Sequence, residues 1–405
     1  MFLTASGICI TIHSERLFYT QFNRRAEMPK TYIGILLHAY QPPTQSESML
    51  NRIFRESYEP LISLLEKEPS SYFSMDLAQS LGERLPPEFL GRIRNLYEDR
   101  RIELLNTFAY HYLAPLTPPE LIERQLCMNE RFYRDNFIGH EPLPGIFPPE
   151  LAFAPSLAPL FRKLGYSWCL ADDEPFVNMR KEVLEAERVP YDWIPFSHGF
   201  GVMMRSGLRS KEVAFHPNIN GAQFADNIVE SMKDWGRRLG GDGDGYLILA
   251  MDAETFGHHL KGTVENALLP FCRQISRRED VELVPINSIF CRFAKKPAFV
   301  PKGSWSTGDS PVPYPLWDHP SNPFHRAWNE FITIAYSVAP SLEGETGRLF
   351  DTSFYSCIPW QYSMGNKGVA RWHLFNFSEI AKLIPDGFEK NRLNYLIGEM
   401  DRLTR

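Results

Sequence analysis

The prediction of the fold starts from the segment Gly245-Tyr-Leu-Ile-Leu-Ala-Met-Asp-Ala-Glu-Thr-Phe-Gly-His-His259. Its six apolar residues, Tyr246–Met251, have the length of a buried strand in a parallel sheet and are too few for a typical helix. Ionisable side chains follow at once, at Asp252, Glu254, His258 and His259. Ligands of helix-covered sheets bind at the carboxyl ends of strands, so the segment predicts an active-site edge. Acidic residues also favour a helix N-terminus, but two carboxylates and two histidines together favour a site.

The same pattern, an apolar run that ends in a polar side chain, recurs along the chain. Such runs are Tyr32–Leu37 before His38, Tyr72–Met75 before Asp76, Ile102–Asn106 before His111, the strand end Gly145–Glu150, Ser167–Ala171 before Asp172, and Gly201–Arg205. Helical patterns lie between them, at Asn51–Lys67 with a break or kink expected at Pro60, at Pro86–Arg100, at Pro118–Asn136 and at Ser156–Leu164. Glu282–Pro285 is a candidate final strand. Strands and helices thus alternate about seven times, which predicts an α/β barrel of parallel strands.

The chain divides into three parts. Residues 1–27 have no matched pattern, and we expect a disordered extension or a start upstream of the natural one, with no assigned function. Residues 28–300 form the predicted barrel. The segment Lys296–Pro323 holds seven prolines and reads as a loop or linker. Residues 301–405 are expected to form this linker and a helical region over the carboxyl face of the barrel, with helices in Asn322–Val338, Glu345–Tyr355 and Ala370–Arg405.

Composition narrows the class of protein. A chain of 405 residues with 43% hydrophobic and 23% charged residues is an ordinary globular protein. Its net charge of −6 gives no reason to expect a nucleic acid or an anionic membrane as partner. No run of apolar residues is long enough to span a membrane. Six scattered cysteines without a C-x-x-C pair favour reduced thiols and a cytoplasmic location. The oligomeric state stays open.

Five short motifs resemble glycoside hydrolase family 57 in their order and spacing. They are His38-Ala39-Tyr40-Gln41-Pro42-Pro43, Tyr110-His111, Phe147-Pro148-Pro149-Glu150, Asp252-Ala253-Glu254-Thr255-Phe256-Gly257 and the segment Tyr355–Tyr362. The resemblance extends from Thr31 to His373. It implies an incomplete (β/α)7 barrel followed by a helical region that completes the cleft. It also implies an enzyme of the amylase, glucanotransferase or branching type that acts on α-linked glucans.

The resemblance carries roles to individual positions. Glu150 matches the nucleophile and Asp252 the general acid/base. His38 and His111 match sugar-binding histidines, and Trp360 lies where the last motif supplies an aromatic platform. The sequence departs from the family pattern in three places: Tyr40 precedes Gln41, Phe147 and Pro148 stand where a tryptophan is common, and Pro359 lies inside the last motif. These departures leave the exact substrate open.

The chemistry explains why two carboxylates are needed. Retaining glycoside hydrolysis uses a nucleophile and an acid/base about 5–5.5 Å apart, and strand ends of a barrel can provide that spacing. Glu254 is the rival for the role of Asp252, because residues two apart in a strand point to the same side. We expect Gln41, Glu254 and His258 to bind substrate. No metal or cofactor is expected, since zinc needs three or four converging ligands and adjacent histidines share one ion poorly.

Two other functions remain open alternatives. A metal-dependent polysaccharide deacetylase also uses an incomplete barrel with aspartate and histidine at its strand ends, but it would bind zinc stoichiometrically. A glycan-binding barrel without catalysis would keep the cleft alone. Hydrolysis and sugar transfer share the covalent intermediate, so the sequence does not choose between them.

Overall fold

The computed structural model describes residues 29–184, 191–238, 243–339 and 342–405. The expectation for residues 1–27 therefore lies outside the described part of the chain. Within that part, no helix is both long and apolar enough to cross a membrane.

Seven parallel strands form the wall of a barrel in the described residues. They are β1 (Thr31–Ala39), β2 (Phe73–Leu77), β3 (Ile102–Leu105), β4 (Gly145–Ile146), β5 (Trp168–Asp172), β7 (Phe200–Arg205) and β8 (Gly245–Asp252). Regular pairing gives the runs β3-β2-β1-β8 and β7-β5-β4. A parallel bridge between Asn106 and Ile146 joins the end of β3 to β4. The Ser206 N–H, directly after β7, donates to the Ile248 carbonyl of β8 at 2.8 Å and so closes the ring. The predicted (β/α)7 barrel is thereby confirmed.

Three further strands lie outside this ring. The strand β6 (Trp193–Ser197) forms an antiparallel pair with β7, and β10 (Ala294–Pro297) pairs with β6. The strand β9 (Val281–Leu283) is the predicted last strand, and it pairs with the first residues of β1. It ends at Leu283 because α11 (Ile286–Arg292) begins three residues later. The sequence analysis did not predict β6 or β10.

The barrel wall explains the apolar runs. All nine residues of β1 are buried, which fits a strand with helices on one face and the barrel interior on the other. Residues of neighbouring strands lie opposite each other in a fixed register. At the carboxyl edge, this register places His38 opposite Asp76 on β2 and opposite Asp252 on β8. Three of the predicted polar strand ends therefore meet at one place.

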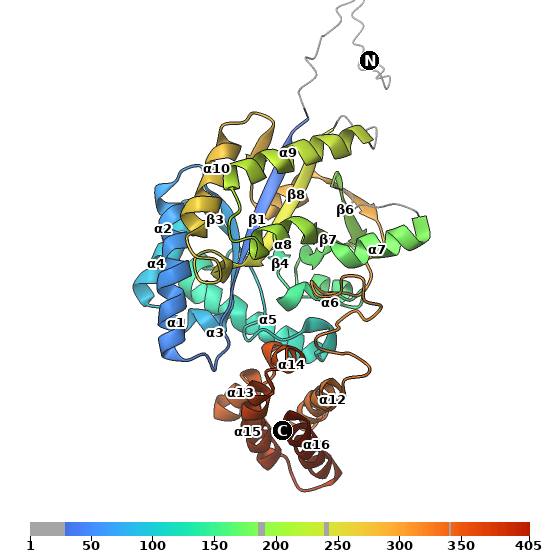
Figure 1. Ribbon diagram of the computed structural model, residues 1–405. Coiled ribbons are helices and arrows are strands. Elements are labelled where there is room, and N and C mark those ends of the chain that lie inside the picture. The colour runs from blue at the N-terminus through green and yellow to red at the C-terminus, as the bar shows by residue number, and fades with distance from the viewer. Residues whose placement is uncertain (1–28, 185–190, 239–242, 340–341) are drawn as a thin grey trace, which may run out of the picture.

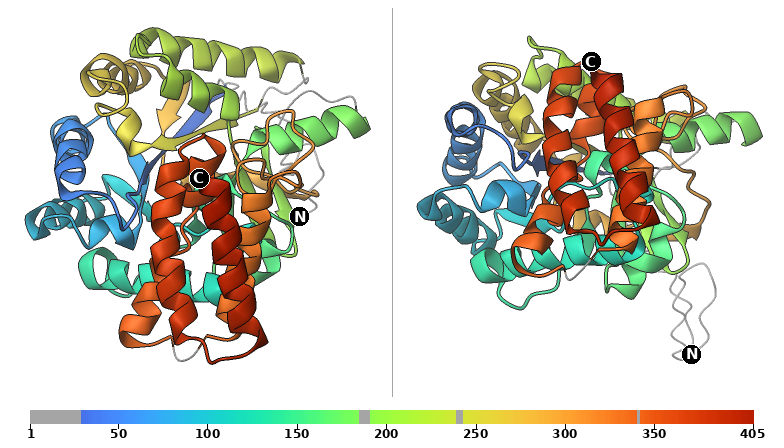
Figure 2. Two further views of the ribbon diagram at one scale, coloured as in Figure 1. Left: turned by 60° about the horizontal axis from the view of Figure 1, so that its bottom comes forward. Right: turned by 90° about the horizontal axis from the view of Figure 1, so that it is seen from below.

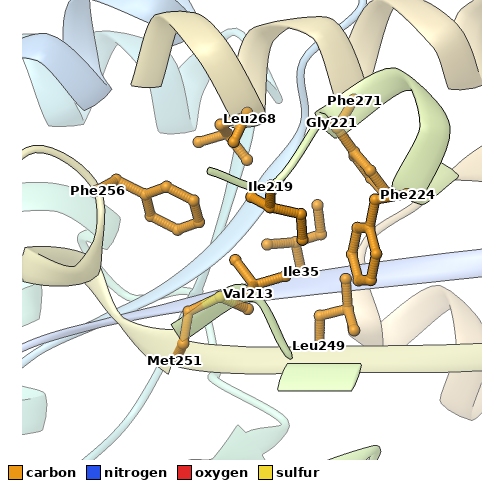
Figure 3. Close-up of a pocket in the computed structure, with 11 residues that line it drawn as sticks. Ile35, Val213, Ile219, Gly221, Phe224, Leu249, Met251, Phe256, Leu268 and Phe271 are labelled. Carbon is orange, nitrogen blue, oxygen red and sulfur yellow. The ribbon is translucent and has the colours of Figure 1, made fainter. Parts of the chain in front are cut away.

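Helices cover the outside of the barrel. They are α1 (Glu47–Ile53), α2 (Glu59–Lys67), α3 (Gln79–Gly82), α4 (Pro87–Glu98), α5 (Pro119–Tyr133), α6 (Leu157–Lys163), α7 (Asp173–Leu184), α8 (Gly207–Phe215), α9 (Gly221–Arg238) and α10 (Leu269–Ser276). Figure 3 shows how they pack: apolar side chains from β1, β8 and the helices α8 to α10 meet around a small cavity. Ile35, Leu249 and Phe271 are among its lining residues. This cavity belongs to the core, because none of its lining side chains is polar.

The helical pattern predicted at Asn51–Lys67 is not broken at Pro60, and its irregularity lies in the turn directly before the proline. The helix runs from Glu47 to Lys67 with a π-helical turn, η1 (Phe54–Tyr58), and Pro60 lies in the first turn of α2. A proline inside a helix clashes with the carbonyl four residues earlier and donates no N–H to it. Widening the turn that contains this carbonyl, that of Glu56, accommodates the ring without ending the helix.

The C-terminal region consists of helices. They are α12 (Pro323–Ser337), α13 (Gly344–Asp351), α14 (Cys357–Ser363), α15 (Lys367–Leu383) and α16 (Phe388–Thr404). Figures 1 and 2 show that these helices lie at the end of the barrel toward which β1 and β8 run. The expected single helical stretch Ala370–Arg405 is two helices, because Pro385 and Gly387 interrupt it. The segment Tyr355–Tyr362, predicted only as a motif, contributes most of α14.

Candidate active site

The strand β1 carries His38 to the carboxyl edge of the barrel. Its imidazole is buried, and its Nδ1 lies 2.7 Å from Asp76 Oδ2 on the next strand. Burial opposes a charge on this ring, but the carboxylates of Asp76, Asp252 and Glu254 together outweigh burial and raise the pKa of His38 to about 9. His38 is therefore an imidazolium ion at neutral pH.

His111 lies next to His38, in the loop that follows β3. Its Nε2 lies 2.9 Å from His38 Nε2, and its Nδ1 lies 2.8 Å from the Ser356 hydroxyl. Burial and then the charge of His38 lower the pKa of His111 well below its usual value. His111 is therefore neutral, so His38 Nε2 donates to His111 Nε2, and His111 Nδ1 donates to Ser356. The ring of Tyr40 stacks on His111, with 3.9 Å between the centroids.

Glu150 occupies a short 3₁₀ turn after β4, Pro149–Leu151. Its φ of 62° and ψ of 15° are left-handed, a conformation that is uncommon for residues with a Cβ and that clusters at active sites. The hydroxyl of Ser356 donates to Oε1 at 2.8 Å, and the indole N–H of Trp305 donates to Oε2 at 2.6 Å. Burial raises the pKa of Glu150, as does Asp252, while these two donors lower it. A partly buried carboxylate that accepts two hydrogen bonds suits a nucleophile.

Asp252 ends β8 beside His38. It is the exposed residue of a strand whose other seven residues are buried, so its carboxylate faces solvent at the barrel mouth. Its charge raises the pKa values of both Glu150 and Glu254, which places the three carboxylates in one electrostatic environment. A solvent-accessible carboxyl group at the barrel mouth is able to reach a substrate and exchange a proton with it.

Glu254 lies deeper than Asp252. Its Oε1 accepts hydrogen bonds from Gln41 Nε2 at 2.6 Å and from the Tyr58 hydroxyl. Burial and the neighbouring Asp252 raise the pKa of Glu254 to about 7. Gln41 also accepts from Gln45 at 2.9 Å, so protein groups already contact both ends of its amide. The expected substrate contacts of Gln41 and Glu254 stay predictions.

The remaining predicted residues contact other parts of the protein. His258 Nδ1 contacts Glu56 Oε2 at 2.6 Å, so this part of its ring is engaged by the protein. Trp360 lies on α14, half-buried, and packs against a small apolar cluster that includes Leu113, Tyr314 and Trp317. The substrate roles of His258 and Trp360 also stay predictions. Asp172 and Arg205, at two other strand ends, form a buried ion pair with each other.

The sequence analysis predicted no contact of Ser356 or Trp305 with Glu150. Each contacts Glu150 from 206 and 155 residues away, respectively. No local pattern reveals such a contact; the only signal was that Ser356 lies inside the quoted segment Tyr355–Tyr362. Asp76 was predicted as a polar strand end, but its contact with His38 was not predicted. Within the described residues, no group of three or more His, Cys, Asp or Glu side chains is placed to hold a metal ion.

Comparisons with known proteins identify the proteins that this chain resembles. Among curated proteins, alpha-amylase 1 of Dictyoglomus thermophilum is 26% identical over 159 residues, 38% of this chain and 23% of that protein. An alpha-amylase of Pyrococcus horikoshii is 23% identical over 154 residues, 37% of this chain and 24% of that protein. The chain thus matches about a quarter of the length of these relatives.

Solved structures share the fold over most of the chain. A 4-alpha-glucanotransferase from Thermococcus litoralis superposes with a TM-score of 0.69 at 15% identity, covering 89% of this chain and 61% of that one. A family 57 branching enzyme from Pyrococcus horikoshii gives a TM-score of 0.68 at 16% identity, covering 92% and 94%. The sequence model of glycosyl hydrolase family 57 matches residues 12–300. The chain belongs to glycosyl hydrolase family 57.

Proposed function

We propose that this chain is a retaining glycoside hydrolase or transglycosylase of α-linked glucans, with Glu150 as nucleophile and Asp252 as general acid/base. The observation that carries the proposal is Glu150 itself: its backbone is left-handed, and its carboxylate accepts two hydrogen bonds. It lies at the same edge of the barrel as the exposed Asp252. Family membership supports the reaction class. The names of the similar proteins, which are amylases, a glucanotransferase and a branching enzyme, support the substrate class.

In this mechanism, a carboxylate oxygen of Glu150 attacks the anomeric carbon while the bond to the leaving oxygen breaks. The Asp252 carboxyl gives its proton to that oxygen, and a glycosyl ester remains on Glu150. Asp252 then takes a proton from water or from a sugar hydroxyl, whose oxygen attacks the same carbon and releases Glu150. The acceptor alone decides between hydrolysis and transfer.

The other roles belong to the same proposal. His38 and His111 bind sugar hydroxyls, and Gln41, Glu254 and His258 contribute further polar contacts. Trp360 offers an aromatic face to a sugar ring. A cytoplasmic location is supported by five described cysteines, Cys127, Cys169, Cys272, Cys291 and Cys357, all of which are free.

The test of the catalytic pair uses its two alanine variants. Glu150→Ala is expected to lower turnover of a maltooligosaccharide by about 10⁴-fold or more, since the nucleophile is lost. Azide should restore part of this activity as an inverted glycosyl azide. Asp252→Ala should impair substrates with poor leaving groups far more than activated aryl glycosides, because only the former need a proton on departure. Proton NMR of the first-formed anomer checks the expected net retention.

An inverted first product, or catalytic carboxyl groups about 9 Å apart in an experimental structure, would contradict this assignment and favour Glu254 acting through water. Dialysis against a chelator is the second test of the proposed function. We expect activity to survive it. One tightly bound zinc per chain, with activity lost on its removal, would instead support a metal-dependent deacetylase.

A further inference from the structure

The two hydrogen-bond donors on Glu150 come from outside the segment that matches the family model. Trp305 lies in the loop after β10 and Ser356 at the start of α14, whereas the match ends at residue 300. We propose that Ser356 and Trp305 are positioning residues that hold the Glu150 carboxylate ionised and in one orientation. This inference rests on the proposed role of Glu150 as nucleophile.

Two backbone hydrogen bonds fix the position of Ser356 independently of its hydroxyl group. Its N–H donates to the His111 carbonyl at 3.0 Å, and its own carbonyl accepts from the Trp317 indole at 3.0 Å. The residue is only 2% exposed, so water does not compete for the hydroxyl. With both backbone groups bonded, the hydroxyl is left between His111 Nδ1, from which it accepts, and Glu150, to which it donates. This hydroxyl is therefore preorganised.

Trp305 contacts both the backbone and the side chain of Glu150. Its backbone N–H donates to the Glu150 carbonyl at 3.2 Å, and its indole N–H donates to Oε2. A backbone pair between Gly303 and Phe153, with N–O distances of 2.8 and 3.1 Å, holds the two segments side by side. The left-handed turn at Glu150 and Leu151 therefore has a partner strand segment, which supports a conformation that these residues rarely adopt.

The donors matter because Glu150 faces charges of both signs. The titratable groups around it are His38 on β1, Tyr40, His111, Asp252 on β8, and Cys357 on α14. Burial and Asp252 raise the pKa of Glu150, whereas Trp305, Ser356 and the charged His38 lower it. Loss of either donor should raise this pKa. Because the nucleophile works only when ionised, the acid limb of the pH profile should move to higher pH.

The experiment measures kcat/KM against pH with an aryl α-maltotrioside for Ser356→Ala and Trp305→Phe. Each variant is expected to lose about tenfold at pH 5 and to recover much of this loss above pH 7, as the removal of a hydrogen bond to a charged group predicts. The loss should appear in kcat and leave KM largely unchanged. Trp305→Phe keeps the ring and removes only the N–H, so it tests the donor separately from aromatic packing.

Matched controls carry the same substitutions away from the site. Ser378→Ala removes a hydroxyl that donates to the Leu374 carbonyl within α15, and Trp372→Phe changes an exposed ring on the same helix. Both should leave the acid limb in place. Thermal melting of all four variants identifies any that fail to fold, and if Ser356→Ala does not fold, Trp305→Phe decides the question.

Trapping separates this inference from the proposed function. A 5-fluoro α-glucosyl fluoride followed by peptide mass spectrometry shows which carboxylate carries the ester in the unchanged protein. An ester on Glu150 together with an unshifted acid limb in the folded variants overturns the positioning role alone. An ester on another carboxylate overturns the proposed nucleophile, and the positioning role with it. An ester on Glu150 with a shifted limb supports both.

Discussion

At the scale of single residues, burial and charge oppose each other most directly at His38. Its imidazolium ion is buried, and the contact with Asp76 raises its pKa from 6.5 to about 9. The folded pKa lies above the unfolded one, so this group stabilises the fold fully below about pH 6.5. This stabilisation is lost as the pH rises through about 9.

This charge predicts a pH dependence of stability that Asp76→Asn should remove. The melting midpoint of the unchanged protein is expected to fall between pH 7 and pH 10. The variant should be less stable at pH 7 and should lose most of this fall, because its His38 is no longer held as a cation. Asp386→Asn, which changes an exposed carboxylate on the surface, should behave like the unchanged protein. The same fall of the melting midpoint with pH in Asp76→Asn and in the unchanged protein would refute the ion pair.

Trp360 provides a second test at this scale. Its half-buried ring packs against the apolar cluster around Trp317, and the rest of its surface is exposed. Trp360→Ala is therefore expected to weaken binding of a maltooligosaccharide by about tenfold or more while costing less stability than the 3–5 kcal/mol of a full core tryptophan. Calorimetric titration of Glu150→Ala with and without the second change measures binding without turnover. A large loss of stability with unchanged binding would assign the ring to the core.

At the scale of elements, the π-turn η1 supports the loop that follows Asp252. Three consecutive residues of this turn bind the loop: Glu56 contacts His258, Ser57 donates to the Ala253 carbonyl at 2.8 Å, and Tyr58 donates to Glu254. Gly257 lies against the same turn, with a φ of +100°, and an added Cβ would come within 1.9 Å of the Glu56 carbonyl oxygen. The turn and the loop are therefore packed in direct backbone contact.

Gly257→Ala should push these two elements apart. It combines an unfavourable φ with a backbone clash, so we expect a loss of several kcal/mol in the free energy of unfolding, about 2–4, and a strong loss of activity. Gly398→Ala is the matched control, because no atom lies within 4 Å of its added Cβ and the residue lies inside α16. That change should be neutral or stabilise by up to about 1 kcal/mol. Denaturant unfolding of both variants measures the difference.

The elements also show what the sequence can and cannot predict. Apolar runs that end in His38, Asp172 or Asp252 predicted the barrel, because parallel strands buried on both faces leave that pattern. The strand β6 was missed, because three of its five residues are only partly buried and it pairs as a hairpin outside the ring. Glu150 and Asp252 were recognisable from short motifs. The partners of Glu150 were not, since Ser356 and Trp305 approach it only after the whole chain has folded.

At the scale of the whole molecule, the barrel and the C-terminal helices share one core. A single buried cluster contains Tyr112 and Phe161 from the barrel part and Phe331 and Phe377 from the helical part. Across the same boundary, Arg124 on α5 binds the buried carboxylate of Asp351 on α13 through two hydrogen bonds of 2.7 and 2.6 Å. Neither part can expose its side of this apolar cluster to water without a large cost in free energy.

Joint burial predicts cooperative unfolding. Scanning calorimetry of the chain should show one transition that includes both parts. Asp351→Ala, which leaves Arg124 without its carboxylate, should lower the midpoint of this transition and cost about 3 kcal/mol without dividing it. Two separate transitions, in either protein, would show that the helices and the barrel fold independently.

The position of Ser356 and Trp305 has a consequence for synthesis on the ribosome. A nascent chain that has been translated through residue 300 already contains Glu150 and Asp252, but not the two donors that hold Glu150. Since chains emerge from the N-terminus first, the carboxylate acquires its partners only when the last quarter of the chain has emerged and docked. Truncated products of translation would therefore carry both of the proposed catalytic carboxylates but lack the two groups that hold Glu150.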